Sequence, residues 1–283
     1  MTETRALPTG ALARLRAQLD LLTPALRRVA ACVLEHPSAV IYQTVTELAE
    51  ASGSGEATVI RMCRDLGFKG FQDFKLALAA DLAATPRQHA RDPKTPAELI
   101  AHAAQQATVA IEETRKVLGS VELDQALTAL AGAPHVLVTG QGASGVTALD
   151  FAYKLLRLGV HATATLDPHL AAMHAVTLPR GAVVIGISRS GSTIDTVHCL
   201  RLARESEAFT IAVTHRAKSP IALLADCVLF TASPEDPLGG GAVSSKIGQL
   251  LVLEALFTGL GLRLPGAERA IRATATAVVD KSY

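Results

Sequence analysis

The chain has 283 residues with a formal net charge of +1, 49% hydrophobic residues and 4% aromatic residues. This length suffices for two domains with cores of their own, and the near-zero charge means that any contact with nucleic acid must come from a local patch. The four cysteines form no C-x-x-C pair, so no metal, disulfide framework or other cofactor is expected. Without a signal peptide or an uncharged apolar run of roughly 20 residues, the chain is expected to be cytoplasmic and to avoid membranes.

Residues 1–83 are expected to form a helical domain. Apolar residues recur at helical spacing at Leu12, Leu15, Leu19 and Leu22. The pair Thr23-Pro24 is typical of a helix start, and that helix should end near His36-Pro37. Thr44 and Glu47 have the spacing of a capping box ahead of another helix.

The segment 44–71 has the spacing of a helix-turn-helix unit. Such a unit needs a small residue inside the first helix, a glycine in the turn and apolar residues in the second helix. The chain offers Ala49, Gly53, Val59 and Met62 at these places. The small residue lets the two helices approach closely, and the glycine permits a left-handed turn.

A second helix starting near Gly55-Glu56 would expose side chains that can reach DNA. The candidates are Glu56, Thr58, Arg61 and Arg64, followed by Lys69 and Lys75. Arginine can contact guanine edges or phosphate, and lysine suits backbone phosphates. A helical dimerisation domain could share this spacing, and acidic residues slightly outnumber basic ones over 44–75. DNA binding, which the spacing favours, would therefore depend on where the cations point.

The run EATVIR, followed by LGFKGFQDFK, resembles the helix-turn-helix signature of the RpiR-type family of bacterial transcriptional regulators. The resemblance implies that residues 1–83 are a DNA-binding domain. Members of the family usually have serine as the N-cap before E-A-T, where this chain has Gly55. Glycine costs only a few tenths of a kcal/mol as a cap. It lacks a hydroxyl, however, so Gly55 is not expected to contact DNA.

Residues 84–97 contain three prolines and predict a linker. A capping box at Thr95 and Glu98 should open a long helix to about Val117, with another helix over 123–131. Short β-branched apolar runs then alternate with helical patterns, at 135–140, 182–188, 209–214 and 226–231, with a weaker run at 161–165. The pattern predicts a roughly five-stranded parallel sheet flanked by helices, in a domain spanning 98–283.

Two of these strands end in loops suited to an anion. The second loop carries Ser188, Ser190, Gly191, Ser192 and Thr193 directly before a helix. The first loop, TGQGASG, carries Gly142 and Ser144. Hydroxyls and free N–H groups at a helix N-terminus bind phosphate well, although serines that merely cap helices would look similar. The first loop also fits G-x-G-x-x-G, but a dinucleotide would need an acidic residue after the next strand, where only Asp167 is available.

These loops together are similar to the sugar isomerase (SIS) domain, which binds phosphorylated sugars. The resemblance implies that the second loop holds the phosphate and that Ser144 contributes beside it. A third matching segment, SSKIGQLLVLEALF (244–257), implies that Ser244 and Lys246 border the ligand. Regulators of this type often have arginine where Lys246 stands, and lysine keeps the charge without the bidentate fork.

The two resemblances, in this order along the chain, imply a DNA-binding regulator of carbohydrate metabolism whose operator affinity changes when a phosphorylated sugar binds. A homodimer or homotetramer is expected, because two recognition helices must match DNA half-sites. The alternative is a sugar-phosphate isomerase with an accessory helical domain. That reaction needs a positioned acid or base. The candidates Asp167, His169, His174 and a buried-looking Glu254 show no convincing pairing, so no catalytic residue is predicted.

Overall fold

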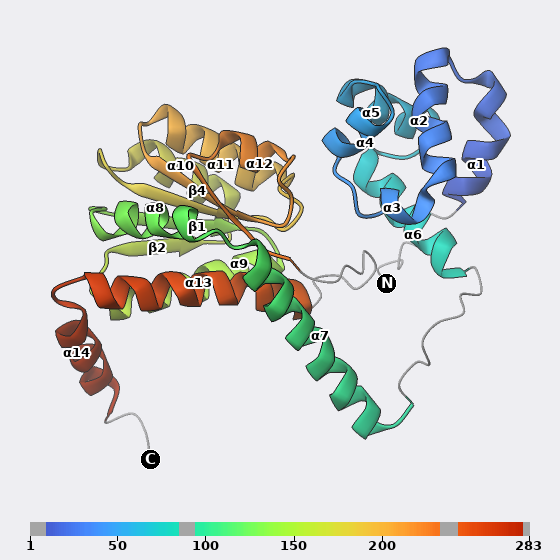
Figure 1. Cartoon of the computed structure of the whole chain (residues 1–283). Helices are drawn as coiled ribbons and strands as arrows, with labels where there is room; N and C mark the ends of the chain where they lie inside the picture. The colour runs from blue at the N-terminus through green and yellow to red at the C-terminus, as the bar shows by residue number, and fades with distance from the viewer. Residues whose placement is uncertain (1–9, 85–93, 233–242, 280–283) are drawn as a thin grey trace, which may run out of the picture. The chain divides into compact units, whose positions relative to one another are not determined.

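The computed structural model describes residues 10–84, 94–232 and 243–279, which fold into two compact units (Figure 1). The helical unit runs to Glu98 and the α/β unit begins at Leu99. The two units have separate hydrophobic cores.

The helical unit contains α1 (Ala11–Gln18), a 3₁₀ helix (Leu19–Leu21), α2 (Pro24–Glu35), α3 (Pro37–Val40), α4 (Val45–Ala51), α5 (Glu56–Asp65) and α6 (Phe71–Ala84). Their apolar faces meet in one core, where Leu15, Val29 and Met62 are fully buried. Thr23 and Pro24 mark the start of α2 as predicted, although the Thr23 side chain makes no capping hydrogen bond.

Three side chains cap the starts of two helices in this unit. The Thr44 hydroxyl accepts from the Glu47 N–H at 3.1 Å, and the Glu47 carboxylate accepts from the Thr44 N–H at 2.7 Å. This confirms the predicted capping box at the start of α4. Asp81 of α6 accepts from the N–H groups of Gly10 and Leu12, at 2.7 and 2.9 Å, and so satisfies the start of α1.

The α/β unit is built on a five-stranded parallel sheet, as the sequence predicts. Its strands are β1 (Val136–Gly140), β2 (Ala162–Thr165), β3 (Val183–Ile187), β4 (Phe209–Thr214) and β5 (Cys227–Phe230). They lie in the order β2-β1-β3-β4-β5, and every neighbouring pair is parallel. The central strands β1 and β3 are buried along their whole length, because helices cover both faces.

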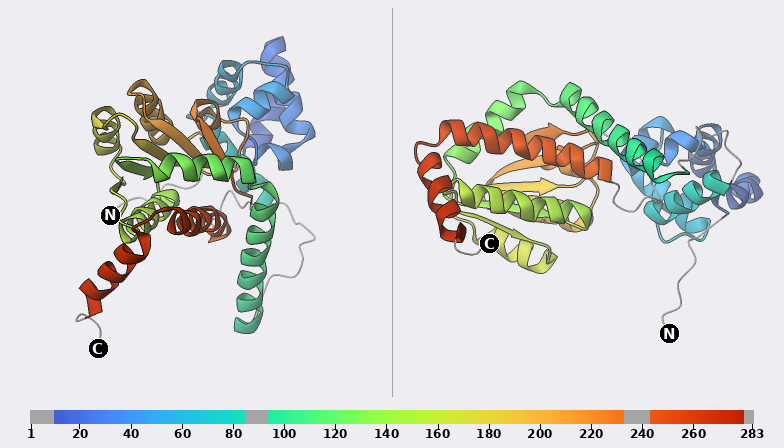
Figure 2. Two further views of the ribbon diagram at one scale, coloured as in Figure 1. Left: turned by 60° about the vertical axis from the view of Figure 1, so that its left-hand side comes forward. Right: turned by 90° about the horizontal axis from the view of Figure 1, so that it is seen from below.

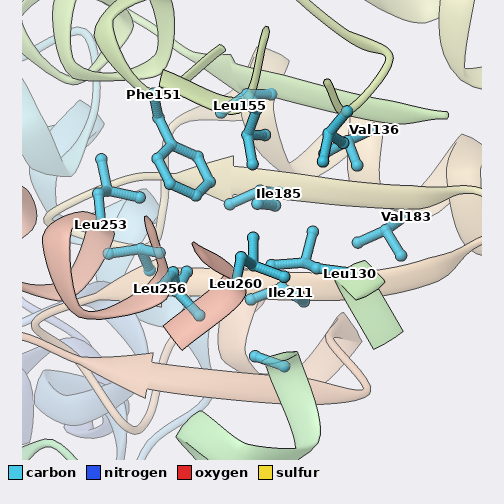
Figure 3. Close-up of a cluster of buried hydrophobic side chains, with 14 of the residues drawn as sticks. Leu130, Val136, Phe151, Leu155, Val183, Ile185, Ile211, Leu253, Leu256 and Leu260 are labelled. Carbon is cyan, nitrogen blue, oxygen red and sulfur yellow. The ribbon is translucent and has the colours of Figure 1, made fainter. Parts of the chain in front are cut away.

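One face of the sheet is covered by α8 (Ser120–Ala131), α9 (Ala143–Arg157) and α13 (Val243–Arg263), the last two side by side (Figure 2, right). Figure 3 shows the core on this face, where Phe151 and Leu155 of α9 and Leu253, Leu256 and Leu260 of α13 surround Ile185 of β3. The other face is covered by α10 (Pro168–Thr177), α11 (Ile194–Glu205) and α12 (Pro220–Leu224). The helix α7 (Pro96–Val117) precedes α8, and α14 (Ala267–Val279) follows α13.

By length and composition, α13 is the one helix among the described residues that could span a membrane. Its Val252, Leu253, Leu256 and Leu260 side chains are fully buried against the sheet. These contacts make α13 a core helix of the α/β unit.

All four cysteines are free thiols, and three of them, Cys63, Cys199 and Cys227, are buried. Burial raises the pKa of Cys63 and of Cys199 to about 12, and the pKa of Cys227 to about 11. Within the described ranges, no three histidine, cysteine or carboxylate side chains gather as a metal site.

Candidate functional site

The helix-turn-helix spacing predicted from the sequence is confirmed by the packing of α4 on α5. Ala49, Val59 and Met62 are buried where the two helices meet. Gly53 has a φ of 59° in the turn, a left-handed conformation that glycine adopts without strain. Gly55 is the N-cap of α5. The second helix therefore begins where the sequence places it.

Three of the predicted DNA-contacting cations lie on the surface of the helical unit. Arg61 and Arg64 are exposed on α5, and Lys69 is exposed in the turn after it. The Arg61 side chain is 74% exposed. Its Nε lies 3.9 Å from a carboxylate oxygen of Asp65, one turn further along the helix. Thr58 is half-buried on the same helix. The carboxylate of Glu56 accepts a hydrogen bond from the Thr46 hydroxyl, so it links the start of α5 to α4.

Lys75 does not lie where the sequence-based prediction needs it. Its side chain is buried, and its ammonium donates to the carbonyl of Gln43 at 2.9 Å. The ammonium also lies 5.3 Å from the centroid of the Phe71 ring. Leu78, three residues further along on the same side of α6, is also buried. The charge of Lys75 is therefore used inside the domain, and the structure gives no support to its predicted contact with DNA phosphate.

The two serine-bearing loops meet at the carboxyl edge of neighbouring strands. Gly140, the last residue of β1, pairs with Ile187, the last residue of β3. From β1 the chain crosses to β2 on one side, whereas β3, β4 and β5 extend the sheet on the other. The loops after β1 and β3 therefore flank a topological switch point, where open α/β sheets bind ligands. A Cβ on Gly140 would lie 2.9 Å from the carbonyl oxygens of Ile187 and Ser144, so only glycine fits.

The second loop is held in shape by its own hydroxyls and by one glycine. The hydroxyl oxygens of Ser188 and Thr193 lie 3.0 Å apart, and the Ser192 N–H donates to the Ser190 hydroxyl at 3.3 Å. Gly191 has a φ of 65°, and a Cβ there would lie 2.1 Å from the Ser219 hydroxyl oxygen. This glycine therefore sets both the backbone turn and the close packing beneath the loop.

The two helices that follow the serine-bearing loops begin without a side-chain cap. Thr193 is the N-cap residue of α11, yet its side chain makes no capping hydrogen bond. At the first loop, the N-cap of α9 is Gly142, which has no side chain to cap with. By contrast, Asp167 caps α10 by accepting from the N–H groups of His169 and Leu170. The helices after the two loops therefore start without side-chain caps, which is the arrangement that an anion can complete.

The segment 244–257 contacts the first loop through Gln249, a residue that was not among those predicted from the sequence. Gln249 of α13 donates from Nε2 to the hydroxyl oxygen of Ser144 at 3.0 Å. Lys246 lies one turn before Gln249 on the same helix and is half-buried, and Ser244 is buried. The signal in the sequence was a single glutamine inside the apolar run of a core helix.

Two of the four acid and base candidates for an isomerase, Asp167 and Glu254, are engaged in structural interactions. Asp167 is held ionised, because the N–H groups of Leu170 and His169 lower the pKa of its carboxyl. His169 is exposed and His174 is half-buried. The expectation that Glu254 is buried is wrong: it is exposed and forms an ion pair with Lys154.

Comparison with known proteins agrees with both halves of the chain. Residues 9–85 match the helix-turn-helix domain of the rpiR family, and residues 129–259 match the SIS domain. An HTH-type transcriptional regulator of Caldanaerobacter subterraneus subsp. tengcongensis is 38% identical over 88% of this chain and 89% of its own length. This chain belongs to the rpiR family of transcriptional regulators. Another relative of this rpiR-family protein, YbbH of Bacillus subtilis, is 37% identical over 89% of this chain and 90% of its own.

A solved structure resembles this rpiR-family regulator over both units. The Vibrio vulnificus NanR protein, solved in complex with ManNAc-6P, is 33% identical and superimposes with a TM-score of 0.86. The superposition covers 96% of this chain and all of that one. The predicted combination of a helix-turn-helix domain with a SIS domain is confirmed.

Proposed function

We propose that this rpiR-family regulator binds operator DNA through α5 and that a phosphorylated sugar, bound where β1 and β3 end, changes its affinity for that DNA. The observation that carries the proposal is the convergence of two hydroxyl-bearing loops at one switch point of the sheet. Two helices without side-chain caps begin at that place. The NanR relative was solved with a phosphorylated sugar, which supports the same ligand class here.

In this proposal the second loop holds the phosphate. Its binding residues are Ser188, Ser190, Gly191, Ser192 and Thr193, with the first N–H groups of α11 as further donors. Gly142 and Ser144 of the first loop bind beside the phosphate, where the Ser144 hydroxyl can also reach a phosphoryl oxygen. Ser244 and Lys246 border the site from the start of α13, where the Lys246 ammonium adds a positive charge.

DNA binding is assigned to the exposed face of α5 and the turn after it. Arg61 and Arg64 are placed toward base edges or phosphate, and Lys69 toward phosphate. Thr58 is a further candidate contact, whereas Glu56 joins α4 to α5. Two copies of α5 are needed to read two half-sites about 34 Å apart, so we propose a homodimer or homotetramer acting in the cytoplasm, where the operator is.

The proposal makes the α/β unit a sensor and not an enzyme. Isomerisation needs a carboxylate or histidine held at the reacting carbons. The Asp167 carboxylate is engaged in capping α10, and Glu254 is paired with Lys154. A regulator needs only different sugar affinities in its two states, typically a coupling of about 1–3 kcal/mol.

The test of the ligand is phosphorus NMR of the full chain with a panel of sugar phosphates, including ManNAc-6P, left overnight. The expected result is one resonance that shifts or broadens with no new product. A chain that affects no resonance would refute the ligand proposal. A new product peak, lost in Asp167→Asn or His169→Ala, would make the protein an isomerase.

The test of the coupling measures operator binding with and without the sugar phosphate identified in this way. Arg61→Ala should weaken operator binding by about 1–3 kcal/mol while leaving sugar binding unchanged. Arg272→Ala, which removes the same charge from α14, is the matched control. The double variant Ser190→Ala with Thr193→Ala should keep basal operator binding and lose the response to the sugar. Operator and sugar that bind without mutual effect would refute the coupling.

A further inference from the structure

A buried polar network joins α13 to the first ligand loop. The Thr147 hydroxyl of α9 donates to Gln249 Oε1 at 2.9 Å, and Gln249 Nε2 donates to the Ser144 hydroxyl oxygen at 3.0 Å. Thr147 and Gln249 are each only 2% exposed. Burying an amide in the apolar side of a core helix costs free energy unless its groups are hydrogen-bonded, so Gln249 requires an explanation.

The network determines which role the Ser144 hydroxyl can take. A hydroxyl carries one proton and two acceptor sites. The amide N–H of Gln249 occupies one acceptor site of Ser144. The amide oxygen faces Thr147 and is not turned toward Ser144. The proton of Ser144 is therefore directed to some other acceptor.

We propose that Gln249 is a positioning residue that holds the Ser144 hydroxyl as a hydrogen-bond donor toward the ligand. A donor at this place favours a ligand group that only accepts hydrogen bonds, such as a phosphoryl oxygen, and disfavours an ammonium group. In this arrangement the amide oxygen of Gln249 faces the Thr147 hydroxyl, whose single proton also lies within reach of the Ser144 carbonyl oxygen, 2.8 Å away. This inference rests on the proposed function, in which Ser144 lies in the sugar-phosphate site.

The test uses Gln249→Glu and inorganic phosphate as the probe, titrated into the full chain by phosphorus NMR between pH 6 and pH 8. A buried glutamate has nearly the same shape, but when it is ionised it accepts hydrogen bonds and would draw the Ser144 proton away from the ligand. Phosphate affinity at pH 8 should then fall by about tenfold or more, as expected for losing a hydrogen bond to a charged group.

The pH profile separates positioning from general damage to the fold. Burial raises the pKa of a glutamate, so at pH 6 the side chain would be protonated and able to donate to Ser144 again. The affinity of Gln249→Glu for phosphate, relative to the unsubstituted protein in the same buffer, should recover as the pH falls. A structural defect would give a loss without this recovery.

Two further variants complete the test. Gln249→Met keeps the volume but frees the Ser144 hydroxyl, and should weaken phosphate binding several-fold at every pH. Thr114→Val is the matched control, because Thr114 is buried and hydrogen-bonded to Ala232 but has no link to Ser144; it should leave phosphate affinity unchanged. If Gln249→Glu binds phosphate as the unsubstituted protein does at every pH, the inference is overturned while the proposed function stands. If the unsubstituted protein binds neither inorganic phosphate nor any sugar phosphate of the panel, both are overturned.

Discussion

Substituting Gly191 by alanine should destabilise the α/β unit through two separable costs. The residue has a φ of 65°, and a left-handed conformation costs an alanine about 1–2 kcal/mol. The new Cβ would also lie 2.1 Å from the hydroxyl oxygen and 2.4 Å from the Cβ of Ser219, well inside contact distance. Relieving such overpacking typically costs about 1–3 kcal/mol. The total is about 2–5 kcal/mol, a fall in Tm of about 4–20 °C for a unit of this size.

Calorimetry of the full chain measures this loss, with Gly181→Ala as the matched control. Gly181 also has a positive φ, of 82°, but a Cβ there meets only Pro134 at 3.8 Å, an ordinary contact. Gly181→Ala should therefore cost about 1–2 kcal/mol, the backbone part alone. Ser219→Gly, which relieves the clash, should recover the steric part of the loss in the Gly191→Ala background although it destabilises the unsubstituted chain. Equal losses for the two glycine variants would refute the steric argument.

Three other measurements test the buried groups. Ellman's reagent should label Cys32 quickly in the native protein and the other three thiols only after unfolding. Burial protects those three thiols from the reagent and raises their pKa. Rapid labelling of the native Cys32→Ser variant would contradict this expectation. Lys75→Met should lower the stability of the helical unit without changing the salt dependence of operator binding, whereas a smaller salt slope would return Lys75 to the DNA interface. Burial, and to a smaller extent the charges of His174 and His161, lowers the pKa of His135 in the folded protein. As the pH falls, the His135 side chain is therefore protonated in the unfolded chain before it is protonated in the folded chain. The free energy of unfolding should fall as the pH drops from about 6.5 through the folded pKa, and His135→Gln should reduce that fall when the two proteins are titrated in parallel.

The helix-turn-helix unit could be predicted because its constraints are local. The spacing of Ala49, Gly53, Val59 and Met62 follows from how two short helices pack across one turn, and all four positions have the expected burial or conformation. The burial of Lys75 could not be predicted, because it depends on residues distant in sequence. Its partner Gln43 lies 32 residues away, and no period in α6 marks which side is covered.

The position of the two hydroxyl-bearing loops at strand ends could also be predicted, since strand ends and hydroxyl-rich loops leave a local pattern. The sequence predicts parallel strands whose ends lie at the same edge of the sheet, but it does not predict the register that pairs Gly140 with Ile187. The contact between Gln249 and Ser144 spans 105 residues, and a polar residue in an apolar run does not say what it faces. Likewise, Glu254 looked buried because its helix is apolar, yet it lies on the exposed side beside Lys154.

The Asp81 carboxylate ties the beginning of the described helical unit to the last described helix of that unit through two backbone N–H groups. Because these contacts and its hydrophobic core lie within the helical unit, its fold does not depend on an element of the α/β unit. The helical unit can therefore be joined to a different sensory domain, in evolution or by protein engineering. A transferred unit must therefore extend past Asp81, because a fusion joined before this residue would lose the carboxylate that accepts hydrogen bonds at the start of α1.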